Sequence, residues 1–311
     1  MRAVTSARRL WSLSVAVALL GVAATAAAGA VAVTRVDFAG GPSFAEFMAA
    51  CQRWIFPHLT TSSLLVIALG SVSLAAVALS ARSAARQLLG ARRFERRLPV
   101  SGDLVGVPRG RVVADSAPHA FCLGWLRPRI YVSQGALDAL GEAERGAVIA
   151  HERHHARRRD PLRLLLARAL GEGLFFLPVL RRLAERYAAL AELAADEAAV
   201  KASRSPQPIA SALLAFDAHP NPVVVGIAPE RVDSLLGRRA RFELPVLLLA
   251  GGLATIAVLV AVTVGMAGAT GHATIGLPVL AAQACMMTMA AVPLMLGAMG
   301  TLSARRLLGG R

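Results

Sequence analysis

Residues 148–155 are Val148-Ile149-Ala150-His151-Glu152-Arg153-His154-His155. Two glutamates and a glycine at 141–144 are typical of a helix start, so we expect a helix over about 139–159. Side chains four residues apart share one face of a helix, so the imidazoles of His151 and His155 can reach a single metal ion. Glu152 lies beside that face, where its carboxylate can act as a general base. The H-E-x-x-H spacing therefore predicts a metal site with Glu152 as the catalytic residue.

His154 leaves an alternative pairing open, because His151 and His154 are three residues apart and could also chelate an ion. We prefer His155, since only that pairing brings in Glu152 as a base, and we interpret His154 as a flanking residue. The other interpretation of these residues is a surface helix with a basic face and no metal.

A third protein ligand is expected downstream, because catalytic zinc commonly has three protein ligands and one open position. The best candidate is Glu192, which with Asp196 forms an E-x-x-x-D pattern one helical turn long. Glu192 would bind the metal, and Asp196 would accept a hydrogen bond from the free nitrogen of a ligating histidine. By itself this acidic pair would be an ordinary solvated helix face. The His, His, carboxylate set predicts one Zn²⁺, although other divalent ions use similar donors.

The composition indicates a membrane protein, since 56% of the 311 residues are hydrophobic. Four apolar segments are about long enough to cross a bilayer as helices, and none of them contains a charged residue. These predicted spans are 11–33, 61–81, 244–269 and 277–299. A cleaved signal peptide is a rival interpretation of the first span, because small residues at 26–30 resemble a cleavage site. The absence of charge within the spans argues against a transporter.

The net charge of +15 comes almost entirely from arginine. Direct nucleic-acid binding is not expected, because aromatic residues make up only 5% of the chain and a base-stacking surface needs more of them. The three cysteines, Cys51, Cys122 and Cys285, show no C-x-x-C spacing, which argues against a disulfide framework or a thiolate zinc site.

The distribution of arginine predicts the orientation of the spans, because cytoplasmic flanks are enriched in basic residues. Arginines gather before the first span, at 82–97 and after the last span, whereas the 34–60 loop is balanced and 270–276 has none. We therefore expect both termini inside the cell, an external 34–60 loop and a multi-pass protein in the plasma membrane. The predicted division is a membrane region at 1–81, a cytoplasmic domain at 82–243 and a second membrane region with a short tail at 244–311.

Turn residues and periodicity predict mixed structure in the central domain. Short strands are expected at 111–114 and 129–133, and further helices at 161–180 and 183–202. Residues 162–180 are apolar enough to suggest a fifth span, but the segment 156–191 between the ligands is shorter than the roughly 40 residues that two crossings need. We expect this helix in the domain core or along the inner membrane surface.

The sequence resembles the membrane metallopeptidase family of the beta-lactam sensor-transducers, the antirepressor type. The resemblance lies in the combination of H-E-R-H-H-A-R-R-R-D at 151–160, L-F-F-L-P at 174–178 and the later E-x-x-x-D. HtpX and the CAAX-prenyl endopeptidases are broader relatives. Segments 120–124 and 128–133 are similar to the strands that precede the metal helix in that group. The resemblance covers about 115–200 in detail.

The resemblance implies an α+β, mostly helical fold: a polytopic protein with four transmembrane helices and a cytoplasmic gluzincin-like zinc metallopeptidase domain. It also implies that His151, His155 and Glu192 bind zinc, that Glu152 is catalytic and that Asp196 supports the metal shell. The strand near Phe121 would hold an extended substrate by backbone pairing. Arg231 lies in a segment faintly similar to a later part of the family, and we interpret it as a helix-surface arginine.

The expected function is that of a zinc-dependent metalloendopeptidase that hydrolyses a cytoplasmic or membrane-proximal protein, with a transcriptional repressor as the substrate suggested by the resemblance. Antibiotic sensors of this family carry an extracellular penicillin-binding domain after the last span, and this sequence stops at Arg311. Direct beta-lactam sensing is therefore not expected. The partners are a protein substrate and the bilayer, and a homodimer or a separate sensor is left open. The alternative function is a catalytically silent, metal-binding signalling or scaffold protein.

Overall fold

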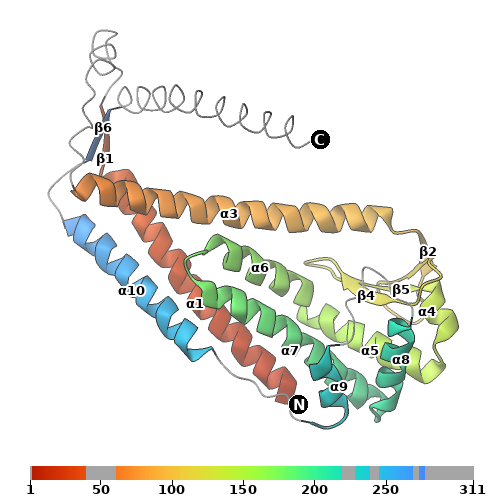
Figure 1. Cartoon of the computed structure of the whole chain (residues 1–311). Helices are drawn as coiled ribbons and strands as arrows, with labels where there is room; N and C mark the ends of the chain where they lie inside the picture. The colour runs from red at the N-terminus through yellow and green to blue at the C-terminus, as the bar shows by residue number, and fades with distance from the viewer. Residues whose placement is uncertain (1, 40–60, 219–227, 239–244, 269–272, 277–311) are drawn as a thin grey trace, which may run out of the picture. The chain divides into compact units, whose positions relative to one another are not determined.

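The computed structural model of the chain describes residues 2–39, 61–218, 228–238, 245–268 and 273–276 (Figure 1). These residues fall into two compact units. The first contains 2–24 and the described residues between 74 and 258, including every predicted site residue. The second contains 25–39, 61–73, 259–268 and 273–276.

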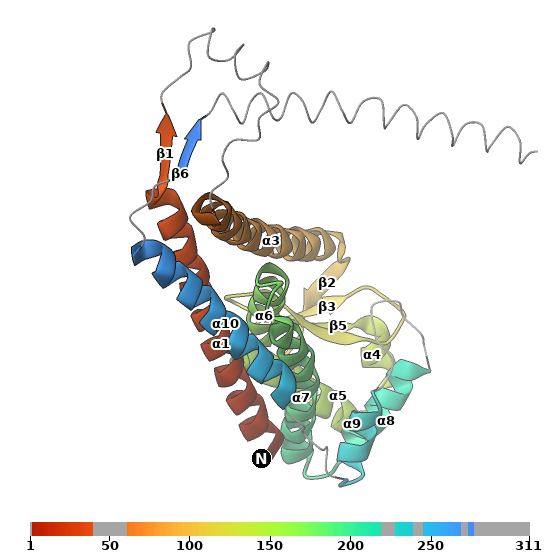
Figure 2. The same ribbon diagram turned by 60° about the vertical axis from the view of Figure 1, so that its left-hand side comes forward.

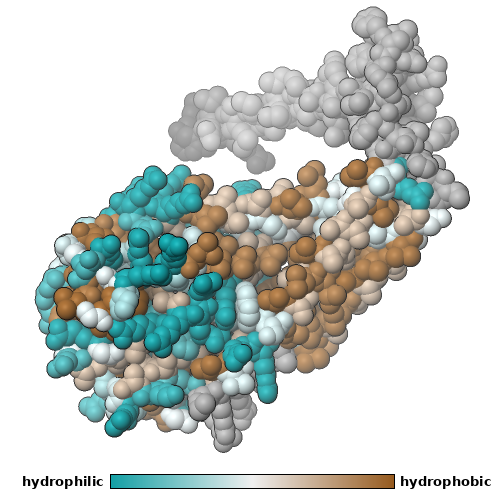
Figure 3. All heavy atoms as spheres, turned by 180° about the vertical axis from the view of Figure 1, so that it is seen from behind, coloured by the Kyte–Doolittle hydropathy of each residue, from teal (hydrophilic) through white to brown (hydrophobic). Residues whose placement is uncertain are grey.

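Among the described residues, three helices are long and apolar enough to cross a membrane: α1 (Arg2–Thr34), α3 (Thr61–Arg97) and α10 (Val246–Gly268). They contain the predicted spans 11–33 and 61–81 and nearly all of 244–269. Many of their apolar side chains are exposed, such as Leu19, Leu74 and Leu247. Figure 3 shows hydrophobic surface gathered along these helices. The fourth predicted span, 277–299, and residues 40–60 of the predicted external loop lie outside the described residues.

Two of these helices are longer than their predicted spans. The first begins at Arg2, and α3 continues through the arginine-rich segment to Arg97. Arginine, alanine, leucine and glutamine are all good helix formers, so the change from apolar to basic composition near residue 81 does not end the helix. The helix ends just before Leu98-Pro99, because a residue that precedes proline is disfavoured in the α conformation.

A four-stranded sheet in the first unit has the order β2-β3-β5-β4. Its strands are β2 (Val100–Asp103), β3 (Gly110–Val113), β4 (Ala120–Leu123) and β5 (Arg129–Ser133). The strands β3 and β5 pair in parallel and match the predicted segments 111–114 and 129–133 closely, while β2 and β4 pair antiparallel to them. The segment near Phe121 is therefore an edge strand of this sheet.

The helices that follow the sheet are α4 (Gln134–Ala139), α5 (Glu142–Arg158), α6 (Asp160–Gly173), α7 (Pro178–Ser203), α8 (Gln207–Asp217) and α9 (Pro229–Leu235). Both α5 and α7 agree with the predicted helices 139–159 and 183–202 to within five residues, and they pack against each other (Figure 2). The predicted helix 161–180 is wrong at its end, because α6 stops at Gly173 and 174–177 form a turn. Proline at 178 starts α7, where its missing N–H costs no helical hydrogen bond.

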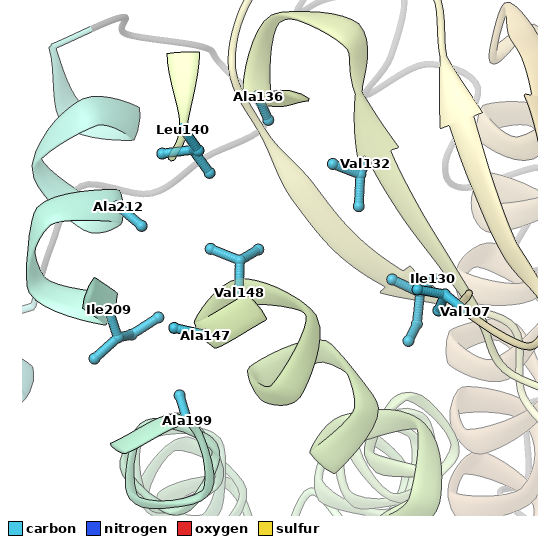
Figure 4. Packing of buried hydrophobic residues seen from close by; sticks show 10 residues of the cluster. All are labelled: Val107, Ile130, Val132, Ala136, Leu140, Ala147, Val148, Ala199, Ile209 and Ala212. Carbon is cyan, nitrogen blue, oxygen red and sulfur yellow. The ribbon is translucent and has the colours of Figure 1, made fainter. Parts of the chain in front are cut away.

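A hydrophobic core joins the sheet to α5, α7 and α8 (Figure 4). Its buried members are Val107, Ile130, Val132, Ala136, Leu140, Ala147, Val148, Ala199, Ile209 and Ala212. Val148 and Ala147 lie on α5 one turn before His151. The core therefore fixes the helix that carries the predicted metal ligands.

The turn between α6 and α7 packs against residues of the predicted spans. Leu174 and Leu177 lie against Gly21 of α1, Gly173 lies against Ser80 of α3, and Val179 lies against Gly252 of α10. α6 has 14 residues and is too short to cross a bilayer. The apolar segment 162–180 is therefore the tip of a helical hairpin that contacts the spans.

The second unit contains a short parallel pairing of β1 (Val36–Ala39) with β6 (Ala273–Gly276). Neither strand was expected, because each is only four residues long. A small apolar cluster in the same unit consists of Ala28, Ala32, Val66, Leu69 and Met266.

Candidate metal centre

Three potential ligands converge in the first unit, from helices α5 and α7. The Nε2 atoms of His151 and His155 are 3.2 Å apart, and each lies 3.5 Å from an oxygen of Glu192. The donor atoms of the three residues all lie within 4.8 Å of one another. Both histidines are almost completely buried, whereas the side chain of Glu192 is 42% exposed. The group therefore opens to solvent on the Glu192 side.

Each histidine also faces a carboxylate with its other ring nitrogen. Nδ1 of His151 lies 2.9 Å from Oδ1 of Asp196, and Nδ1 of His155 is hydrogen-bonded to Oδ2 of Asp160 at 2.9 Å. Such carboxylates fix the tautomer and the ring orientation of metal-binding histidines and raise their basicity. Both Nε2 atoms consequently point toward Glu192.

Asp160 reaches His155 because of the way α5 ends. Arg159, which links α5 to α6, adopts a left-handed conformation with φ 53° and ψ 43°. This conformation reverses the chain, so the first residue of α6 comes back beside the last turn of α5. Asp160 had no predicted role from the sequence, since its contact with His155 depends on this turn.

Glu152 is buried on α5, as are the two ligand histidines. Burial raises the pKa of its carboxyl, while His151, His155 and Arg231 act to lower it. A carboxyl with a raised pKa in a site of this kind is suited to accept and then return a proton.

Arg231 was interpreted from the sequence as a helix-surface residue, and that interpretation is wrong. Its guanidinium, carried by α9, is only 16% exposed and forms two hydrogen bonds to Asp196, at 2.7 and 2.8 Å. It also lies 3.3 Å from Oε2 of Glu192. The contact joins residues 35 positions apart, and no local pattern signals it.

The charges of the site are strongly coupled. Burial by itself would lower the pKa of His151, but Asp196 and Glu192 raise it to about 10. Burial would raise the pKa of Glu192, but the two histidines and Arg231 hold it at about 2. The carboxylates of Glu192 and Asp196, whose pKa values are lowered, thus stay ionised and attract positive charge.

His154 is not part of the converging group. It is half-buried, and burial lowers its pKa to about 4, so it stays neutral at ordinary pH. The pairing of His151 with His155 was the one preferred from the sequence, and it is the pairing found in the cluster.

The donor set fits a zinc ion. Two imidazole nitrogens and one carboxylate, with an open side toward solvent, are a common ligand set of catalytic zinc. Both histidines have the carboxylate partners that such ligands usually have. Among the described residues the group contains no softer ligand such as a thiolate. Burial raises the pKa of the Cys122 thiol on β4.

The edge strand β4 packs beside α5. Its residues are all partly exposed, and Phe121 stacks on Tyr131 of the neighbouring strand, with ring centroids 5.3 Å apart. β4 pairs only with β5 among the described residues, so its other edge has no strand partner in this part of the chain.

Comparison with known proteins gives one match. A family model described as BlaR1 peptidase M56 matches residues 64–239, a segment that includes all the residues of the metal group. Comparisons with curated proteins and with solved structures gave no match. The relation to HtpX and the CAAX-prenyl endopeptidases stays a prediction.

Proposed function

The chain belongs to the BlaR1 peptidase M56 family of membrane metallopeptidases, and on this premise we propose that it is a zinc-dependent endopeptidase that cleaves a protein at the inner membrane surface. The observation that carries the proposal is the convergence of His151, His155 and Glu192, whose donor atoms lie within 4.8 Å of one another. Residues 82–243 would form the catalytic domain between two membrane regions.

His151, His155 and Glu192 would hold the zinc ion. When bound there, zinc would supply Lewis-acid chemistry, which polarises a peptide carbonyl and lowers the pKa of water. Asp196 and Asp160 orient the two imidazoles from behind, and Arg231 balances the charge of Asp196 and Glu192.

Glu152 is the proposed general base. Its carboxylate would take a proton from the attacking water and pass it to the nitrogen of the leaving amine. Burial raises the pKa of Glu152, which makes the carboxylate a stronger base than a solvated glutamate.

The substrate would bind along the free edge of β4. A sheet edge offers backbone N–H and C=O groups, and an extended peptide can pair with them as an added strand. β4 packs against the helix that carries Glu152, so a peptide on this edge would run past the metal group. A regulatory protein such as a repressor is the substrate class that we propose.

The catalytic domain is proposed to lie in the cytoplasm of a multi-pass plasma-membrane protein. The three candidate spans and the arginine-rich segments at 2–9 and 82–97 support this orientation. A homodimer or a separate sensor protein as a partner stays a prediction.

The variant Glu152→Gln tests the proposal. We expect hydrolysis of a peptide panel to fall by at least about 100-fold, since general acid–base catalysis contributes 10²–10⁴-fold, while zinc content stays at one ion per chain. Glu142→Gln on the exposed first turn of the same helix is the matched control and should keep full activity.

Two outcomes would contradict the proposal. Equal hydrolysis by the wild type and Glu152→Gln would remove Glu152 from the mechanism. Bound zinc without hydrolysis of any peptide would favour the alternative, a catalytically silent metal-binding scaffold.

A further inference from the structure

Tyr187 of α7 contacts Asp160, the carboxylate partner of His155, and is completely buried. Its hydroxyl donates a hydrogen bond of 2.7 Å to Oδ1 of Asp160. The other oxygen of Asp160 is the one bonded to Nδ1 of His155. The tyrosine hydroxyl, the carboxylate and the imidazole therefore form one continuous chain of hydrogen bonds that ends at Nδ1 of the ligand His155.

The hydroxyl of Tyr187 donates the hydrogen bond that Oδ1 of Asp160 accepts in the described part of the chain. Among the described residues, the other polar group near Oδ1 is Nε of Arg158, at 3.7 Å, which is too long for a hydrogen bond. Without the hydroxyl, one oxygen of a buried carboxylate would lose its bonded partner, and the carboxylate could turn away from His155.

The ring of Tyr187 is held in turn by the start of the first candidate span. Trp11 of α1 lies 5.2 Å from it between ring centroids. The guanidinium of Arg163 lies 5.5 Å from the Trp11 ring, and its Nη1 donates to the Tyr187 hydroxyl at 3.4 Å. The Trp11 and Tyr187 rings are tilted by 45° to each other, and an aromatic pair of this kind with a cation over one ring forms a stable contact in a partly buried setting. All of these residues belong to the first unit.

We propose that Tyr187 is a positioning residue for the metal ligand His155, acting through Asp160, and that Trp11 holds Tyr187 in place. The first candidate span then forms part of the support of the metal centre. This inference rests on the proposed function, because it assumes that His151, His155 and Glu192 bind the ion.

The test is the variant Tyr187→Phe in the full-length protein, which removes only the hydroxyl and keeps the ring against Trp11. We expect Zn²⁺ and Co²⁺ to bind about tenfold more weakly in competition with a chromophoric chelator, the lower end of the effect of removing an outer-shell partner. The visible spectrum of the Co²⁺-loaded variant should also change, because the imidazole of His155 is reoriented. The value of kcat should fall while KM stays unchanged.

The chain provides a matched control, since it contains only two tyrosines. Tyr131 is also buried, and its hydroxyl donates a 2.9 Å hydrogen bond to Glu95, away from the metal centre. Tyr131→Phe therefore removes an equivalent bond and should leave metal affinity and the Co²⁺ spectrum unchanged. A loss of affinity in both variants would indicate a general loss of stability and would overturn the inference.

Metal binding by the wild type separates this inference from the proposed function. If the wild type binds no metal, the proposed function fails. If the wild type binds one ion and Tyr187→Phe binds it within twofold of the wild-type affinity, only the positioning role fails.

A second variant decides the matter if Tyr187→Phe does not fold. Trp11→Phe keeps an aromatic ring beside Tyr187 but reduces the contact with Arg163, and it should weaken metal binding severalfold. Trp125→Phe, in the turn after β4, is the control. Equal metal affinity in these two variants and the wild type would also overturn the proposal.

Discussion

The two ligand histidines are held by carboxylates that are themselves stabilised in different ways. Asp196 behind His151 is bonded to a charged guanidinium, that of Arg231. Asp160 behind His155 is bonded to a neutral hydroxyl. A hydrogen bond from a charged donor is stronger than one from a neutral hydroxyl, so the two carboxylates are held with different strength. Removal of the Asp196 carboxylate and removal of the Asp160 carboxylate should therefore have different effects on metal binding.

The variant Asp196→Asn should weaken both metal binding and the fold. It removes the carboxylate behind His151, which should lower zinc affinity about 10- to 100-fold. It also leaves the charge of Arg231 buried without its bidentate partner, and breaking a buried pair on one side costs about 3–5 kcal/mol. Chelator competition measures the first effect, and thermal unfolding in detergent measures the second.

Asp233→Asn is the control for this prediction. Asp233 pairs with Arg238 on the exposed side of α9, at 3.3 Å. An exposed pair contributes about 0–1 kcal/mol, so both metal affinity and unfolding temperature should stay near wild type. Unaltered zinc affinity in Asp196→Asn would show that Asp196 does not support His151.

Helix α6 and its turn pack closely against the long helices of the first unit through small residues. Gly173 is the clearest case, because a Cβ atom built there would lie 1.7 Å from Oγ and 2.8 Å from Cβ of Ser80. Glycine at such positions lets two helix backbones approach each other. The hairpin that carries Asp160 and Glu192 is consequently fixed to α3 by backbone proximity.

Gly173→Ala should separate α6 from α3. A rotation of the Ser80 side chain does not relieve the overlap, since its Cβ atom and the carbonyl oxygen of Ala76, at 3.0 Å, are also too close. Overpacking of this kind costs about 1–3 kcal/mol, so the unfolding temperature in detergent should fall.

Gly171→Ala, one half-turn earlier in α6, is the matched control. A Cβ atom there meets its nearest neighbours at 3.4 Å, and alanine is the better helix former by about 1 kcal/mol. Its unfolding temperature should equal or exceed that of the wild type. A fall of similar size in both variants would mean that helix α6 tolerates no added methyl group and that contact with Ser80 is not the cause.

At the scale of the whole molecule, the proposed orientation depends on the arginine-rich ends of the candidate spans. α3 continues without a break from its apolar half into the segment 82–97, and Glu95 near its end receives a hydrogen bond from Tyr131 of the sheet. The span and the catalytic unit are therefore joined by a continuous helix. We therefore expect the sheet to lie on the same side of the membrane as the arginines.

Labelling of the native cysteines tests this orientation. Cys51 lies in the predicted external loop 34–60, and Cys122 lies in β4. A membrane-impermeant maleimide should label the wild type in intact cells, and the Cys51→Ser variant should lose that labelling. Cys122 is only partly exposed, so it should react weakly and only after the cells are opened. A wild type that is labelled at Cys51 only after the cells are opened would reverse the orientation.

Features that depend on local spacing were predictable from the sequence. His151 and His155 lie one helical turn apart wherever the helix is placed, and the same holds for Glu192 and Asp196, because the period of an α-helix is fixed by backbone geometry. Apolar segments as long as the bilayer is thick identify the candidate spans for a similar reason. The family resemblance stated from these residues is confirmed by the family match over 64–239.

Features that join distant residues were decided only by the tertiary structure. The left-handed turn at Arg159 brings Asp160 to His155, and α9 brings Arg231 to Asp196 across 35 positions. The turn 174–177 was predicted as helix, since its apolar composition does not reveal that Pro178 starts a new one. Such contacts arise from the packing of several elements at once, and side-chain periodicity within one element carries no information about which partner will face it.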